Sequence, residues 1–183
     1  MGLFFKKRVI AVVFIVAALG AGLFVFIALR NGSEPAEPAG VKNIAPERRV
    51  IGLSVEGREI EAYKYGNGET HLVFVGGIHG GYEWNSVLLA YKFMDYLNAN
   101  LEAIAKGPTV TVIPSANPDG VYKVIGKEGR FRALDVPTDE PTAPGRFNAR
   151  AVDLNRNFDC KWKPNGVWRG ETVSAGTGPF SEP

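Results

Sequence analysis

The stretch HLVFVGGIHGG, residues 71–81, decides the fold of this 183-residue chain, because an apolar run leads directly into a glycine-rich turn. Residues 71–75 show no polar alternation, which is typical of a strand that is covered on both faces. Residues 84–104 then place apolar side chains at helical spacing, and residues 109–113 form a second apolar run. Strand, helix and strand predict a βαβ unit, and therefore an α/β fold whose parallel or mixed sheet carries helices on its faces.

Shorter patterns on both sides of this unit predict a hairpin, a turn and a loop. Residues 49–55 and 59–65 alternate between apolar and polar side chains and are joined by Glu-Gly-Arg, which indicates a β-hairpin. Asn-Pro-Asp-Gly at 117–120 has the composition of a turn. Residues 126–145 lack periodicity and are expected to form a long loop. We predict that residues 48–183 form the globular domain.

The amino-terminal part of the chain carries an unbroken apolar run at residues 9–29, which follows three cationic residues at 6–8 and ends at Arg30. At about 1.5 Å per residue, a helix of this length spans ~30 Å, the thickness of a hydrocarbon core. We therefore predict a transmembrane anchor. The cations before the run orient residues 1–8 to the cytoplasm, so that the rest of the chain lies outside it as a single-pass membrane protein.

A cleaved signal peptide and a buried soluble helix are the two alternatives to an anchor. Signal peptides usually have an apolar core of about 7–15 residues and a small-x-small cleavage site, whereas this run is longer and ends in Ala-Leu-Arg. A soluble helix is seldom apolar on all sides. Residues 30–47, which are rich in Pro, Glu and Ala, are expected to form a linker between the membrane and the domain.

The composition excludes several classes of protein. With 21 Lys and Arg against 19 Asp and Glu, the charge is nearly balanced, which gives no support to a nucleic-acid partner. The hydrophobic share of 45% is that of a globular protein and excludes a wholly disordered chain. The single cysteine, Cys160, cannot form an internal disulfide, and we expect it to be a small buried residue.

A first group of candidate site residues follows the strand at 71–75. His79 and Glu83 lie beyond its carboxyl end, which is where ligands bind in α/β sheets. A His and a Glu four residues apart can converge on one ion, and zinc accepts both kinds of ligand. The alternative is that His79 caps a turn and that Glu83 lies at a helix N-terminus, where a negative charge is favoured. His71 falls within the predicted strand and is expected to be structural.

A second group lies in Asp-Leu-Asn-Arg-Asn-Phe at residues 153–158. Arg156 with Asn155 supplies planar donors that suit a carboxylate. The alternative is a solvated loop with an ordinary ion pair, such as that between Arg156 and Asp153. Arg146 is a third possible contact for an anion, and three other arginines compete with it for this role: Arg130, Arg132 and Arg150.

Taken together, these motifs resemble the zinc metallocarboxypeptidases. The order is Gly-Gly-Ile-His-Gly-Gly-Tyr-Glu at 76–83, Asn-Pro-Asp-Gly at 117–120, Gly-Arg-Phe-Asn at 145–148 and Val-Asp-Leu-Asn-Arg-Asn-Phe at 152–158. The resemblance is to the carboxypeptidase A-like group, especially to bacterial membrane-anchored members that act on peptides or cell-wall peptides. It covers about residues 48–183. It implies the amino-terminal half of the carboxypeptidase fold, with a mixed, largely parallel sheet.

The resemblance also implies a role for individual residues. His79 and Glu83 match the first two zinc ligands, and Arg146 matches the residue that steadies the oxyanion developing on the scissile carbonyl. Asn155 and Arg156 match the clamp on the terminal carboxylate of the substrate. The implied reaction is hydrolysis of a peptide bond at the substrate C-terminus by a zinc-activated water, with a Glu that takes the proton. The implied substrate is a peptide or cell-wall peptide with a free carboxylate.

Two features depart from this family. Its usual ligand spacing is His-x-x-Glu, whereas three residues separate His79 from Glu83, and the glycines between them are expected to absorb the extra residue. No His follows His79, so the third zinc ligand is absent, and no later Glu stands in the context of the general base. We therefore expect a fragment or a decayed copy that has little peptidase activity by itself and leaves a sheet edge unpaired.

Two other functions remain open from the sequence. One is an amide hydrolase of the desuccinylase or deacylase kind, which shares the His and Glu zinc pattern but acts on small acylated amino acids. The other is a non-catalytic module that keeps the carboxylate clamp without a working metal site. Tight, stoichiometric zinc would favour an enzyme, and its absence would favour the binding module.

Overall fold

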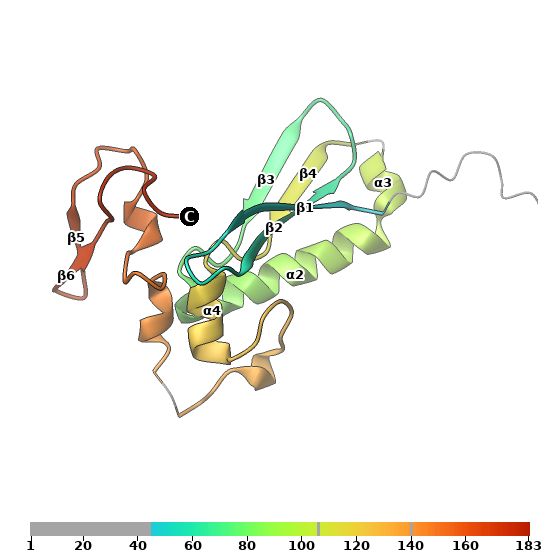
Figure 1. Cartoon of the computed structure of the whole chain (residues 1–183). Coiled ribbons are helices and arrows are strands. Elements are labelled where there is room, and N and C mark those ends of the chain that lie inside the picture. The colour runs from blue at the N-terminus through green and yellow to red at the C-terminus, as the bar shows by residue number, and fades with distance from the viewer. Residues whose placement is uncertain (1–44, 106, 140) are drawn as a thin grey trace, which may run out of the picture. The chain divides into compact units, whose positions relative to one another are not determined.

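The computed structural model describes residues 45–105, 107–139 and 141–183, which form a mixed α/β fold (Figure 1). Four strands make one sheet in the order β1-β2-β4-β3. Their bounds are Glu47–Leu53 for β1, Glu59–Tyr65 for β2, His71–Val75 for β3 and Thr109–Ile113 for β4. The predicted hairpin and both predicted strands of the βαβ unit are therefore present.

The sheet is mixed, as predicted, but it is not largely parallel in the part of the chain that the structure describes. Strands β1 and β2 pair antiparallel, and so do β2 and β4, whereas β3 and β4 run parallel in register from His71↔Thr109 to Val75↔Ile113. Strands β1 and β2 are antiparallel because the short turn between them reverses the direction of the chain. The helical crossover between β3 and β4 makes that one pair parallel.

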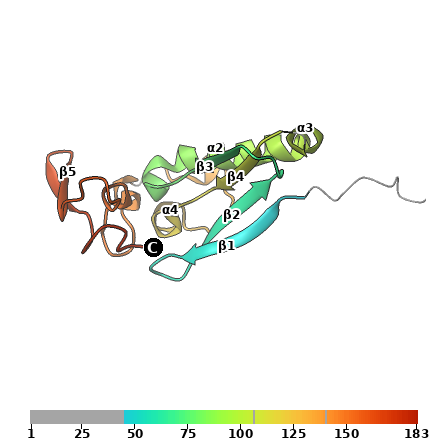
Figure 2. The ribbon, with the colours of Figure 1, turned by 90° about the horizontal axis from the view of Figure 1, so that it is seen from above.

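The crossover helix forms the core with one face of the sheet. Helix α2 (Trp84–Ala99) is followed by its C-cap residue Asn100 and then by the short α3 (Leu101–Ala105), so the predicted helix is interrupted. In Figures 1 and 2, α2 runs along one face of the sheet. The buried residues of α2 recur at helical spacing and pack on β2 and β4: Val87, Ala90, Tyr91, Met94 and Leu97 from the helix, with Tyr65, Val110 and Val112 from the strands. Each fully buried large apolar side chain contributes about 1.5–3 kcal/mol.

Strand β3 is less covered than its sequence indicates. It lies at the edge of the sheet, and Leu72, Val73 and Val75 are 52%, 63% and 50% exposed. Val73 and Val75 share the face of the sheet that is opposite to α2, because side chains alternate along a strand. The prediction of a strand covered on both faces is therefore wrong within the described residues. An apolar run records the tendency to be buried but not whether a neighbouring strand lies beside it.

The segment 117–120 was predicted as a turn but begins a helix, α4 (Pro118–Ile125). The side chain of Asn117 caps this helix by accepting a hydrogen bond from the backbone N–H of Gly120 at 2.9 Å. Proline is favoured in the first turn of a helix, where its missing N–H has no intrahelical partner. The described residues of the expected loop at 126–145 contain two short 3₁₀ turns, η2 (Ala133–Asp135) and η3 (Ala143–Arg146), the second of which ends one residue beyond it.

The carboxyl-terminal part adds a further short turn and a hairpin that the sequence did not predict. These are η4 (Leu154–Arg156), β5 (Asn165–Trp168) and β6 (Glu171–Ser174), of which the last two pair antiparallel. The buried side chain of Asn157 ties this part together. Its Nδ2 donates to the carbonyl oxygens of Ala175 at 2.6 Å and Gly178 at 2.9 Å. Cys160 is exposed, contrary to expectation.

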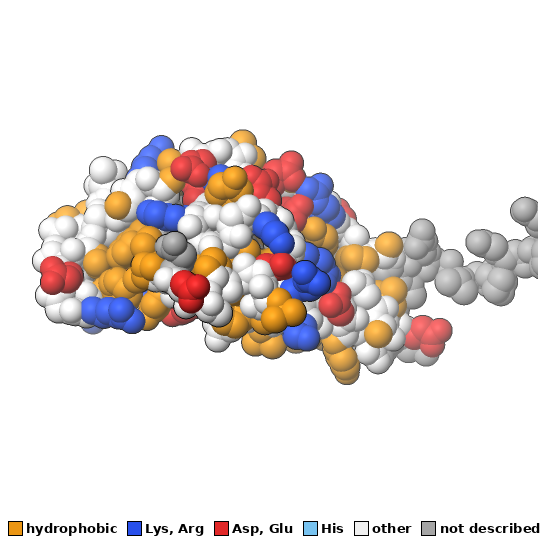
Figure 3. All heavy atoms as spheres, turned by 90° about the horizontal axis from the view of Figure 1, so that it is seen from below, with side chains coloured by type: hydrophobic (Ala, Val, Ile, Leu, Met, Phe, Trp, Pro, Cys, Tyr) orange, Lys and Arg blue, Asp and Glu red, His pale blue; other side chains and the backbone are white. Residues whose placement is uncertain are grey.

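The amino-terminal predictions lie outside the described residues. They comprise the basic tail at 1–8, the anchor at 9–29 and most of the linker at 30–47. Within the residues that the structure does describe, no helix has the length and apolar character needed to cross a membrane. Figure 3 shows acidic and basic side chains interspersed with apolar ones on one face of the molecule. This mixture agrees with the nearly balanced charge of the sequence.

Candidate active site

The site begins where the two parallel strands end at the same edge of the sheet. The backbone pairing of β3 and β4 continues past their last residues, because the N–H of Gly76 donates to the carbonyl of Ile113 at 2.8 Å. The N–H of Ala116 donates to Gly76 O at 2.9 Å, and that of Asn117 to Gly77 O at 3.0 Å. The segment before His79 is thus fixed against the segment before α4, at the edge where α/β sheets bind ligands.

His79 and Glu83 are brought together by a 3₁₀ turn, η1 (Gly80–Glu83). The N–H of Tyr82 donates to the carbonyl of His79 at 3.0 Å, and the Nδ1 of His79 lies 3.0 Å from the Oε1 of Glu83. Gly80 has φ +44°, so this tight turn accommodates the extra residue between the two side chains. Neither side chain forms a capping hydrogen bond, although each residue precedes a helical segment. The side chain of His79 therefore does not cap the turn, whereas Glu83 does lie at the N-terminus of α2, as the alternative expected.

The imidazole of His79 is buried between two carboxylates. Its Nε2 lies 3.4 Å from the Oδ1 of Asp153, on the other side of the ring from Glu83. Both ring nitrogens are inaccessible to solvent and lack a hydrogen bond of acceptable geometry. Burial alone would lower the pKa of His79, but the facing carboxylates of Asp153 and Glu83 outweigh it and raise the pKa above its ordinary value.

Asp153 links the imidazole to a buried arginine. Its side chain is fully buried, and its Oδ2 accepts hydrogen bonds from Nε and Nη2 of Arg146 at 3.1 and 2.9 Å. Burial would raise the pKa of Asp153, but its contacts with His79 and Arg146 hold that pKa below the usual range. The sequence placed Asp153 only in a possible ion pair with Arg156. Its position between two apolar residues, Val152 and Leu154, was the signal in the sequence that this segment is buried.

The structure distinguishes Arg146 from the other arginines that were candidates for an anion contact. Arg130 pairs with Asp95, Arg132 with Asp135 and Arg150 with Glu182. Arg146, at the end of η3, is 5% exposed and is the one that contacts Asp153. Its guanidinium lies 4.9 Å from the centre of the Trp168 ring and 5.8 Å from that of Tyr82.

Four glycines allow the backbones of η1, α4 and η3 to touch, and we call this contact the glycine junction: Gly80, Gly81, Gly120 and Gly145. A Cβ on Gly120 would lie 2.2 Å from the carbonyl oxygen of Gly145, and one on Gly81 would lie 2.6 Å from that of Gly120. No side chain other than hydrogen fits such distances. The junction therefore sets the separation between the turn that carries His79 and the turn that carries Arg146.

The predicted carboxylate clamp is exposed and begins two residues after Asp153. Asn155 and Arg156 belong to η4, and both are exposed. The side chain of Arg156 lies against β5. Its Nη2 donates a hydrogen bond to Val167 O at 3.5 Å, and a Cβ added to Gly166 would come within 3.2 Å of its Cδ. Asn155 and Arg156 line a pocket of about 260 Å³ together with Lys161 and others.

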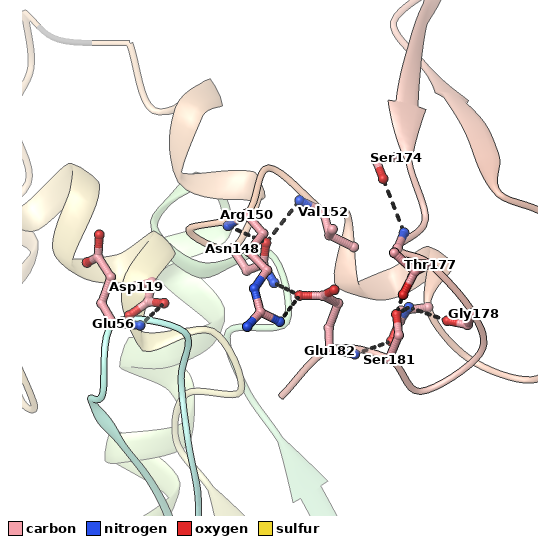
Figure 4. A network of polar contacts seen from close by, with 12 residues as sticks. Glu56, Asp119, Asn148, Arg150, Val152, Ser174, Thr177, Gly178, Ser181 and Glu182 are labelled. Atoms are coloured by element: carbon pink, nitrogen blue, oxygen red, sulfur yellow. Dashed lines mark hydrogen bonds and ion pairs between the residues drawn. The ribbon is translucent and has the colours of Figure 1, made fainter.

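Two polar networks hold the surrounding loops in place (Figure 4). The buried Asp119 accepts hydrogen bonds from Ser54 Oγ at 2.5 Å and from the N–H of Glu56 at 3.2 Å, which ties the β1–β2 turn to α4. Asn148 donates to Glu182 Oε2 at 2.7 Å and accepts from the N–H of Val152 at 2.9 Å. The second network fixes the segment that leads into Asp153.

The donor set around His79 fits a zinc ion. Two atoms that each lie about 2 Å from one zinc ion are about 3–3.5 Å from each other, and the Nδ1 of His79 and the Oε1 of Glu83 are 3.0 Å apart. A buried nitrogen without a partner is costly unless a ligand or ion satisfies it. Within the described ranges, no cluster of three or more His, Cys, Asp or Glu residues could hold a metal.

Comparison with known proteins places the chain in a family. The family model described as zinc carboxypeptidase matches residues 45–183. The bacteriocin BCN5 of Clostridium perfringens is 34% identical over 140 residues, which are 74% of this chain and 14% of that protein. The catalytic chain of human carboxypeptidase N is 31% identical over 121 residues, which are 59% of this chain and 25% of that protein.

A solved structure shows the same fold. Bovine thrombin-activatable fibrinolysis inhibitor, in complex with tick carboxypeptidase inhibitor, has a TM-score of 0.55 at 21% identity. The match covers 89% of this chain and 51% of that one, so the chain spans about half of this structure and a smaller share of both curated relatives. Since the family model covers most of the chain, this protein belongs to the zinc carboxypeptidase family.

Proposed function

We propose that residues 45–183 form the first part of a zinc carboxypeptidase domain that cleaves the last peptide bond of a peptide or cell-wall peptide. The observation that carries this proposal is the environment of His79. Its buried ring nitrogens lack hydrogen-bond partners, and its Nδ1 faces Glu83 at 3.0 Å. Membership of the zinc carboxypeptidase family supports the same assignment.

In this proposal His79 and Glu83 hold the zinc ion. When bound, zinc polarises the substrate carbonyl and lowers the pKa of water. Asp153 faces the Nε2 of His79, which orients the ring and leaves Nδ1 directed toward Glu83. A carboxylate behind a ligating imidazole fixes its tautomer and increases its basicity as a ligand.

The remaining residues bind and orient the substrate. Arg146, which is held by Asp153 and stacked near Trp168, presents a fixed positive charge where the carbonyl oxygen gains negative charge. Asn155 and Arg156 bind the terminal carboxylate of the substrate at the pocket of η4. Such a clamp holds the last residue in register, so cleavage is restricted to the substrate C-terminus.

Zinc titration with the purified protein tests the metal site directly. We expect His79→Ala and Glu83→Gln to weaken zinc binding by at least about tenfold, as loss of a ligand or its support does. His71→Ala is the matched control, because His71 is the other histidine and lies exposed on β3, away from the site. Equal zinc affinity of His79→Ala and His71→Ala would contradict the proposal.

A peptide-binding measurement distinguishes the second candidate, a carboxylate-binding module. Asn155 and Arg156 are exposed and line a pocket of about 260 Å³, which favours this candidate. If the protein binds a peptide with a free carboxylate through Arg156 but binds no zinc, it is such a module. If it also binds zinc through His79, it is part of an enzyme.

We also propose that residues 9–29 anchor the protein in a membrane, with the domain outside the cytoplasm. The support is the length of the apolar run and the cations that precede it. The full chain should remain with membranes after alkaline extraction, and its domain should be cleaved by protease added outside intact cells. Release of the full chain by alkali would contradict the anchor.

A further inference from the structure

The turn between β5 and β6 places an arginine in an unfavourable backbone conformation. Trp168 pairs with Glu171, so that Arg169 and Gly170 alone connect the two strands. Arg169 has φ +53° and Gly170 has φ +83°. Two-residue hairpin turns of this type favour Asn or Gly at such positions, because a Cβ is strained at positive φ. Strained residues of this kind gather at binding sites.

The side chain of Arg169 is exposed but is held by two aromatic rings. Its guanidinium carbon lies 4.9 Å from the centre of the Trp168 ring and 5.6 Å from that of Tyr82. Its Nη2 also donates a hydrogen bond to the hydroxyl of Tyr82 at 3.3 Å. The two rings contact each other edge to face at 5.3 Å. These contacts fix the position of the positive charge before any ligand arrives.

The charge of Arg169 is not neutralised by a carboxylate of the described chain. Arg146, which lies over the same two rings, is paired with Asp153. Arg169 has no ion pair with any acidic side chain described in the structure, although Glu171 is two residues away. A fixed, exposed and unpaired guanidinium is suited to bind an anion.

The location of Arg169 defines which anion this is. Tyr82 immediately precedes Glu83. The guanidinium groups of Arg169 and Arg146 both lie over the rings of Tyr82 and Trp168, which contact each other. We propose that Arg169 is a specificity-determining residue that binds an acidic side chain on one of the two substrate residues flanking the scissile bond. This inference rests on the proposed function, since it takes the site of Glu83 and Arg146 as the place of cleavage.

Calorimetric titration of the zinc-loaded full protein with matched peptides tests the inference. One peptide pair carries Glu or Gln at the last residue, and a second pair carries Glu or Gln at the penultimate one. We expect the Glu peptide of one pair to bind about tenfold more tightly than its Gln partner, as a charged hydrogen bond allows. This preference should decrease at high salt.

Two variants of the turn separate recognition from folding. Arg169→Asn should remove the preference for Glu and leave binding of the Gln peptides unchanged, and it should raise the melting temperature because Asn suits the turn. Arg169→Lys should keep part of the preference. The control is Arg49→Asn, which changes an exposed arginine on β1 and should leave the affinities of all four peptides unchanged.

The outcomes are distinct. Equal affinity for Glu and Gln peptides in the unaltered protein, or a preference that survives in Arg169→Asn, overturns the inference but leaves the proposed function standing. A failure of all four peptides to bind overturns the carboxylate clamp, and with it both the proposed function and this inference.

Discussion

Among single residues, Asp153 has the largest consequences, because it joins the imidazole of His79 to the guanidinium of Arg146 in a buried position. Asp153→Asn removes the negative charge and leaves Arg146 buried without a counter-ion. Breaking a buried pair in this way costs about 3–5 kcal/mol. We expect urea unfolding to show a loss of this size, and zinc affinity to fall about 10–100-fold because the imidazole loses its support.

The matched control for this variant is Asp159→Asn, which removes the charge of an exposed acid six residues further along the chain. It should change the free energy of unfolding by less than about 0.5 kcal/mol. If Asp153→Asn proved as stable as Asp159→Asn, the described network would not be a feature of the folded protein.

A second acid gives a pH dependence with a defined sign. Asp135 accepts hydrogen bonds from Lys127 Nζ at 2.9 Å and from the N–H of Arg132 at 2.8 Å. These contacts, that of Lys127 first, hold the pKa of its carboxyl well below the usual range. A carboxyl whose pKa is lower in the folded state stabilises that state at pH values above its pKa in the unfolded chain, which is about 4. This stabilisation is lost as the pH falls toward the lowered pKa of the folded state.

We therefore expect Asp135→Asn to be less stable than the unaltered protein near neutral pH and to lose less stability between about pH 5 and pH 2. Urea unfolding followed by tryptophan fluorescence at several pH values measures this difference. Asp139→Asn serves as the control, because Asp139 bonds only its neighbour Thr138 among the described side chains. Identical acid sensitivity of Asp135→Asn and the unaltered protein would refute the prediction.

At the scale of elements, the glycine junction is the most demanding contact. Gly120→Ala should be favourable for helix α4 by about 1 kcal/mol on propensity alone. A Cβ there would, however, lie 2.2 Å from Gly145 O and 2.6 Å from the Nδ2 of Asn117. Overpacking typically costs about 1–3 kcal/mol, so we expect net destabilisation in thermal unfolding. Gly178→Ala, whose Cβ meets nothing within 4 Å, should be neutral.

The elements also show what the sequence can and cannot predict. Strands β3 and β4 were predicted because each is a short apolar run, and helix α2 because its apolar residues recur at helical spacing. Helix α4 was missed because Asn-Pro-Asp-Gly suits a turn, while Asn and Pro equally suit the cap and first turn of a helix. The hairpin of β5 and β6 was missed because its strands are short and mostly exposed, so they show little apolar alternation.

The candidate site was predicted in part for similar reasons. The sequence suggested that His79 and Glu83 are neighbours, because residues four apart converge when the chain between them forms a helical or tight turn. The structure has such a turn in η1. It did not indicate which arginine meets Asp153, since that depends on how η3 and η4 pack in three dimensions. Nor did it reveal Arg169, which reaches Tyr82 across 87 residues of chain.

For the whole molecule, the decisive feature is strand β3, which lies at the edge of the sheet among the described residues and exposes apolar side chains. An exposed, apolar edge strand is a template for pairing with another chain. We expect the domain to self-associate in solution, and Val73→Lys to reduce this association, because Val73 is 63% exposed on that edge. Static light scattering over a range of protein concentrations measures the effect.

A lysine placed elsewhere controls for the general effect of charge on solubility. Leu134 is 90% exposed and lies in η2, outside the sheet. Leu134→Lys adds the same charge and removes a comparable apolar group without altering β3. If both variants reduced association equally, the edge strand would not be its cause.

The glycine junction has a further consequence for how this sequence can diverge. A mutational library should return glycine alone where three backbones meet, at positions 80, 81, 120 and 145. Other glycines have positive φ but open surroundings, and there asparagine should be tolerated: Gly57, Gly126, Gly129 and Gly170. Related sequences can therefore replace the glycines of the surface turns. The glycines of the junction are constrained by the atoms that surround them and not by backbone torsion alone.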